Sequence, residues 1–182
     1  DIDLSGTEQT GSVIPEFSGV LDGENHKITG LKAPLFGQLS GTVSNVAIDA
    51  GAIEIGNNVD TTVGIFANTM TNATVEKVMI ANGSISRAGK AAGFAGTVTD
   101  STVKNIFIQG IVNAVSTASG FAETSHHSVM ENIYVNIDVN GADGAGFLVN
   151  STGENSYKNI CSIGNVAENM YKLAKTDITF TN

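Results

Sequence analysis

Short apolar runs alternate with polar turn residues along this chain, and the alternation repeats about every 27 residues. The clearest marker of the repeat is a phenylalanine, which usually follows a glycine. Successive markers are 30, 28, 27 and 26 residues apart. They are Phe36, Phe66, Phe94, Phe121 and Phe147. A period of this length predicts stacked structural units that share a core.

Other positions repeat in step with the phenylalanine. A mostly asparagine position follows it by 9 to 12 residues, and an aliphatic residue comes directly afterwards. These turn positions are Asn45, Lys77, Asn105, Asn132 and Asn159. A later aliphatic column consists of Ile53, Ile85, Val112, Val139 and Val166. Each repeat therefore contains three apolar patches separated by polar turns, which favours three short strands per repeat.

Three strands per repeat are typical of a triangular solenoid, in which each strand pairs with its equivalent in the next coil. Helical arrays are excluded because no 3.6-residue period persists, and the coil length and glycine content disfavour a leucine-rich repeat. We therefore predict an all-β chain that forms a right-handed parallel β-helix. It would have about five to six coils of ~27 residues and a capped N-terminal turn.

The pattern divides the chain into three parts. Residues 1–33 alternate around an Asp22-Gly23 turn and are expected to form the N-terminal cap and first coil. Residues 34–166 are expected to form five repeats. Residues 167–182 include the strand-like run 178–180 but no sixth Gly-Phe, so we expect a terminal coil or cap that continues into a longer parent. The chain begins without a methionine or an export signal, which also suggests a piece of a longer polypeptide.

Charge and composition disfavour several classes of binding partner. The chain has 9 Lys plus Arg against 18 Asp plus Glu, so its formal net charge is −9. An acidic surface disfavours nucleic acid and anionic membranes as partners, and no apolar stretch is long enough to span a bilayer. The single cysteine, Cys161, excludes an internal disulfide and is expected to be a structural thiol in a strand.

Two segments resemble known bacterial surface proteins. Residues 93–96 read Gly-Phe-Ala-Gly, residues 103–106 read Val-Lys-Asn-Ile, and Gly110 follows. This pattern resembles the glycine-rich β-helical repeat called GLUG. The run from Phe17 to Ile28, with Gly19, Asp22-Gly23 and His26, resembles the coil that opens such regions.

The combination, over roughly residues 14–166, is similar to the non-catalytic region of streptococcal immunoglobulin-A-cleaving zinc metallopeptidases. The resemblance implies a secreted or cell-wall-attached protein whose parent holds zinc in another domain. The His-Glu-x-x-His motif of that family's zinc site is absent from this sequence. We therefore expect no cofactor in this chain.

One column of apolar residues lies between two inward positions of the second strand. If its neighbours face the core, Met79, Phe107 and Tyr134 face outward and stack as an exposed stripe. A register slip of one residue would bury them instead. Contiguous exposed apolar surface marks a contact, either with a neighbouring domain of the parent or with a host glycoprotein.

Histidines are the next candidates. His126 and His127 are adjacent, so on a regular strand their rings diverge, although Glu123 could join one of them in a metal site. A polar loop without metal is the simpler interpretation. His26 is either a general base or a turn residue that bonds to the backbone near the cap.

Carboxylates decide between binding and catalysis. A β-helical polysaccharide lyase or glycosidase needs acids at equal register in neighbouring coils. The repeats do not align acids in this way, since Asp49 aligns with Ala81 and Gln109. A calcium site among scattered acids stays open, and the repeated asparagines are expected to form an amide ladder between coils.

We therefore predict a non-catalytic spacer or recognition region and assign no catalytic or metal-binding residue in this chain. The resemblance implies that its parent is a zinc metallopeptidase that cleaves immunoglobulin. Two alternatives stay open. One is a polysaccharide lyase or glycosidase, and the other is the structural stalk of an adhesin.

Overall fold

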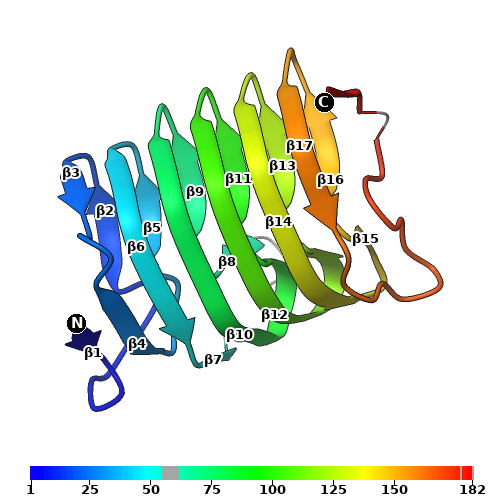
Figure 1. Ribbon diagram of the computed structural model, residues 1–182. Coiled ribbons are helices and arrows are strands. Elements are labelled where there is room, and N and C mark those ends of the chain that lie inside the picture. The colour runs from blue at the N-terminus through cyan, green and yellow to red at the C-terminus, as the bar shows by residue number, and fades with distance from the viewer. Residues whose placement is uncertain (55–61, 177, 182) are drawn as a thin grey trace.

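The computed structural model describes residues 1–54, 62–176 and 178–181, which form a parallel β-solenoid of about six stacked turns (Figure 1). All strand pairs in the described residues are parallel, and the all-β prediction is confirmed. Within this part of the chain, no helix is long and apolar enough to cross a membrane.

The described strands belong to two sheets, which lie one behind the other in Figure 1. The smaller sheet contains β2 (Ile14–Phe17), β5 (Phe36–Leu39), β9 (Ala67–Thr71), β11 (Ala95–Thr99), β13 (Ala122–His126) and β16 (Leu148–Thr152). The larger sheet contains β1 (Ile2–Asp3), β3 (Val20–Asp22), β4 (Lys27–Leu31), β6 (Thr42–Ala50), β7 (Ala52–Glu54), β8 (Thr62–Gly64), β10 (Thr74–Ala92), β12 (Thr102–Ser119), β14 (Val129–Asn140), β15 (Asp143–Ala145), β17 (Ser156–Ser162) and β18 (Phe180–Thr181).

The larger sheet runs through corners where the sequence predicts separate strands. β10 pairs in turn with β6, β7 and β8. It is therefore one continuous strand over a stretch that the apolar pattern divides into separate short strands. The chain changes direction at single residues with positive φ, such as Lys77 at 55°, while pairing with the next coil resumes at once. A turn of one residue interrupts the ladder too briefly to separate the strands.

Stacked phenylalanines form the centre of the core. Phe36, Phe66, Phe94, Phe121 and Phe147 are fully buried, as the repeat predicts. The ring of Phe94 lies between those of Phe66 and Phe121, with centroid distances of 4.7 and 4.8 Å and nearly parallel planes. These distances match the ~4.8 Å separation of paired strands, so each coil adds one ring to the stack.

The asparagine turn positions form one corner of the solenoid. Their φ values lie between 53° and 57°, a left-handed conformation that asparagine tolerates better than most residues. The amide of Asn132 donates to Asn105 Oδ1, and the amide of Asn159 donates to Asn132 Oδ1, each at 2.8 Å. The predicted ladder is therefore present over three coils. At the previous coil Lys77 takes the position, and Asn105 donates to Glu76 instead.

The N-terminal residues cover the first coil. β2, β3 and β4 pair in parallel with the next coil, and β1 adds one short strand below β4 through Ile2 and Ile28. The side chain of Gln9 holds this cap in place. It donates to the carbonyls of Leu4 and Gly30, and it accepts from the Lys32 amide at 2.7 Å. These bonds satisfy backbone groups that an open sheet edge would leave unpaired.

The chain after β17 follows a further, looser turn across the C-terminal end (Figure 1, orange to red). It touches the preceding coil through isolated bridges at Val166, Tyr171 and Ala174 before β18 pairs with β17. The backbone of Leu173 takes the position of a sixth phenylalanine, since its carbonyl accepts from the Phe147 amide at 2.8 Å, although the Leu173 side chain is 36% exposed. The Gly-Phe marker is therefore missing because the last coil has leucine at the position of the phenylalanine.

The phenylalanine stack gives the first prediction. Phe94→Ala should lower the free energy of unfolding by about 3–5 kcal/mol, because it removes a buried ring and leaves a cavity between two others. Phe107→Ala removes the same atoms from a partly exposed position on the outer face and should cost about 1 kcal/mol or less. Urea unfolding followed by circular dichroism measures both changes. Equal losses in the two variants would contradict the core assignment.

Candidate functional site

An apolar stripe crosses three neighbouring coils on the outer face of the larger sheet. Met79, Phe107 and Tyr134 lie opposite one another in the pairing of β10, β12 and β14. Met79 is 45% exposed and Phe107 36% exposed, while Tyr134 is half-buried. The structure thus exposes the stripe, and its role in binding stays a prediction.

The geometry of the stripe follows from the strand pattern. Val78 and Ile80, on either side of Met79, are buried in the core, so the residue between them points outward. The rings of Phe107 and Tyr134 stack with a centroid distance of 5.3 Å and an angle of 3° between their planes. The column ends at small residues, Ala47 on one side and Cys161 on the other. The stripe is therefore a short, preformed apolar ridge.

A column of alternating charges runs beside the stripe, on the other side of the asparagine corner. Glu76, Lys104, Glu131 and Lys158 occupy equal positions in four successive coils. Lys104 Nζ lies 3.1 Å from Glu131 Oε2, and Lys158 Nζ lies 3.7 Å from Glu131 Oε1. The hydrogen bond and charge of Lys104, then those of Lys158, hold the pKa of the Glu131 carboxyl below its ordinary value. This column was not predicted from the sequence, although each member directly precedes a turn position.

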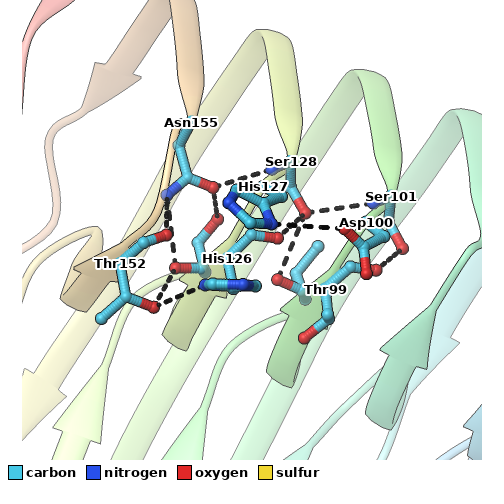
Figure 2. A network of polar contacts seen from close by, with 10 residues as sticks. Thr99, Asp100, Ser101, His126, His127, Ser128, Thr152 and Asn155 are labelled. Carbon is cyan, nitrogen blue, oxygen red and sulfur yellow. Dashed lines mark hydrogen bonds and ion pairs between the residues drawn. The ribbon is translucent and has the colours of Figure 1, made fainter.

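The second corner of the solenoid is built from serines and is shown in Figure 2. The backbone N–H of Ser101 donates to Ser128 Oγ at 3.1 Å, and the N–H of Ser128 donates to Asn155 Oδ1 at 2.8 Å. Both serines are buried, so these side chains take the place of ladder carbonyls at the turn. Asp100 and His127 precede the two serines and have φ values of 48° and 46°.

This corner corrects the prediction for the histidine pair. The centroids of the His126 and His127 rings are 3.8 Å apart, so the rings converge. The prediction that they diverge is wrong because the positive φ of His127 breaks the alternation of a regular strand. His127 Nδ1 lies 3.6 Å from Asp100 Oδ1, and His126 Nδ1 lies 3.0 Å from Thr152 Oγ1 (Figure 2).

Glu123 does not join the histidines. Its carboxylate contacts Lys90 Nζ at 3.3 Å and accepts a hydrogen bond from Thr62 Oγ1. In the described part of the chain, no group of three or more His, Cys, Asp or Glu residues could hold a metal ion. The described residues therefore offer no cluster of these side chains for zinc or calcium.

The remaining candidates, His26 and Asp49, contact neighbouring residues of the solenoid. His26 Nδ1 lies 3.2 Å from the amino terminus of Asp1, and the His26 backbone N–H donates to the Gly23 carbonyl. Asp49 accepts from Asn82 and contacts Lys27 Nζ at 3.2 Å, and these contacts hold the pKa of its carboxyl below the ordinary value.

Acids do not gather in one column. Among the strand pairs of the described residues, every carboxylate lies opposite a neutral residue or a lysine. Asp49, for example, lies opposite Thr29 and Ala81. The lyase or glycosidase alternative therefore gains no support from the register.

Comparison with protein families gives one finding. A family model described as M26 IgA1-specific Metallo-endopeptidase N-terminal region matches residues 4–83 of the 182. The match covers the N-terminal cap, the opening coil and the start of the repeats. It supports a relation to IgA proteases and is consistent with a non-catalytic region of an IgA protease-like protein. No curated protein and no solved structure matched the chain. The GLUG resemblance stays a prediction.

The charge column gives a pH-dependent prediction. The lowered pKa of Glu131 means that the folded chain binds this proton less readily than the unfolded chain. Its contribution to stability is therefore present above the ordinary pKa of 4.5 and is lost as the pH falls through the lowered folded value. Glu131→Gln should lower the melting temperature at pH 7, and the difference from wild type should shrink towards about pH 3.

Glu16→Gln is the matched control. Glu16 lies opposite Gln38 and forms no ion pair in the described residues, yet its replacement removes the same negative charge. Differential scanning calorimetry of both variants from pH 7 to about pH 3 makes the comparison. If Glu16→Gln lowers the melting temperature as much as Glu131→Gln does, the charge column contributes nothing specific.

Proposed function

We propose that this chain is a non-catalytic spacing and recognition region of a secreted or cell-wall-attached metallopeptidase-like protein. In this proposal the Met79–Phe107–Tyr134 stripe contacts an immunoglobulin substrate, which a catalytic domain elsewhere in the parent cleaves. The observation that carries the proposal is the exposed stripe, in register over three coils, on a chain whose residues 4–83 match the family model of an IgA1-specific peptidase region.

The fold suits both parts of this role. Stacked coils extend a solenoid without enlarging its core, and about six coils at ~4.8 Å give a stiff element of roughly 25–30 Å. Such an element can hold a substrate at a fixed distance from another domain. The charges next to the stripe are paired within the solenoid, so its apolar ridge stands beside a polar rim, as in many protein interfaces.

The family description names IgA1, and this name is the reason for proposing IgA1 as the partner. On contact with a protein surface, this apolar ridge would bury two stacked aromatic rings and a flexible methionine side chain. Aromatic residues and methionine are enriched at such interfaces. We therefore take IgA1 as the partner to be tested, with a neighbouring domain of the parent as the competing occupant.

Surface plasmon resonance with immobilised IgA1 tests this function. The chain should bind IgA1 and not immunoglobulin G, and Met79→Ser, Phe107→Ser and Tyr134→Ser together should weaken binding by about tenfold or more. Circular dichroism and urea unfolding should show that the triple variant still folds, because all three side chains lie on the surface.

Val20→Ser and Val115→Ser together form the matched control. Both valines are more exposed than the stripe residues, at 80% and 56%, and neither belongs to the stripe column. This variant should bind IgA1 as the wild type does. If the wild type does not bind IgA1, or if both variants bind it unchanged, the recognition role is wrong, and the stalk alternative is then favoured.

A further inference from the structure

A polar groove crosses the outer surface next to the stripe and is separate from it. Its volume is about 540 Å³, and it runs across β10, β12, β14 and the residues that follow β17. The side chains that matter for its chemistry are those of Asn82, Gln109, Ile111, Asn136, Asp138 and Asn165. The groove is thus long, open and aligned with the solenoid axis.

A bulge and a pair of glycines shape the groove. The pairing between β10 and β12 shifts by one residue between Ile80 and Gly83, so Asn82 is an extra residue in its coil. Gly83 then pairs with Gly110, where a Cβ would lie 1.9 Å from the Gly83 carbonyl oxygen. No side chain fits at Gly110. The backbone therefore forms the floor of the groove between two rows of outward side chains.

The amides of this groove differ from the other amide columns of the surface. Asn105 and Asn132 bond to each other at 2.8 Å, and Asn113 and Asn140 at 3.0 Å. Gln109 and Asn136 also lie opposite each other, yet their side chains form no hydrogen bond within the described part of the molecule. The two amides keep their donors and acceptors for a ligand.

The charges of the groove exclude an anionic ligand. Among the residues whose side chains the structure describes, no lysine or arginine lines it, and the whole chain carries a formal charge of −9. Among the described lining residues Asp138 carries a charge, and its carboxylate already accepts from both the backbone N–H and the side-chain amide of Asn165, each at 2.8 Å. The Asp138 carboxylate would repel a polyanion, and none of the described lining residues is a cation that could compensate for the lost hydration of the anion.

The lining therefore favours a neutral ligand that is rich in hydroxyl groups. Amides can donate to and accept from the same hydroxyl, and the exposed Ile111 side chain offers an apolar contact for carbon-bound hydrogens. The amides of Gln109 and Asn136 lie opposite each other in neighbouring coils at the ~4.8 Å spacing of paired strands, which is close to the length of one sugar residue. We propose that the groove binds a neutral linear oligosaccharide, with roughly one sugar residue per coil.

Isothermal titration with four neutral hexasaccharides tests the site, namely hexamers of maltose, cellulose, mannan and chitin type. At least one should bind the whole chain. Gln109→Ala with Asn136→Ala should weaken that binding by about tenfold, because two ligand hydroxyls lose their partners. Asn113→Ala with Asn140→Ala is the matched control, since it removes two amides of the same sheet outside the groove, and it should change the affinity by less than about twofold.

Three outcomes would overturn the proposal. They are no binding of any neutral hexasaccharide up to about 10 mM, tighter binding of a heparin hexasaccharide, and equal losses in the two amide variants. The stripe triple variant serves as a separate control and should bind the hexasaccharide like the wild type. Loss of IgA1 binding without loss of sugar binding, or the reverse, therefore tells apart a failure of the recognition role and a failure of this site.

Discussion

Equal register between neighbouring coils is the constraint on which this structure depends. Each strand pairs in parallel with its equivalent about 4.8 Å away, so outside the bulges a side chain lies next to the residue at the same position of the neighbouring coil. Inside, this places Phe94 between Phe66 and Phe121. Outside, it produces columns of amides, charges and apolar residues. The core and the binding surfaces are thus two results of one pairing pattern.

The corners show how that pairing survives each change of direction. At one corner, asparagines adopt positive φ and bond amide to amide, as Asn105 and Asn132 do. At the other, the hydroxyl of Ser128 and the amide of Asn155 accept from N–H groups that the turn takes out of the ladder. On the faces, opposite charges such as Lys104 and Glu131 alternate between coils, and a slip of one coil would place like charges together.

The sequence predicts the solenoid well because its core positions repeat in residue type as well as in spacing. The exposed stripe also follows from alternation, since Val78 and Ile80 face inward. The histidine pair was misjudged because the positive φ of His127 cannot be read from two adjacent letters. The groove was missed because it depends on one extra residue, Asn82, that shifts the register between two coils. Features of the average repeat are predictable, whereas those created by local departures from it are not.

Cross-linking through the native Cys161 tests the register most directly. Cys161 lies opposite Tyr134, and strands about 4.8 Å apart place the Cα atoms within the range of a disulfide. Tyr134→Cys should therefore form an intramolecular disulfide on mild oxidation, as seen by mass spectrometry of the monomer. Asn136→Cys, two residues further along the same face, should not. A disulfide in the Asn136→Cys variant alone, or in neither variant, would contradict the stacking on which the core, the stripe and the groove all depend.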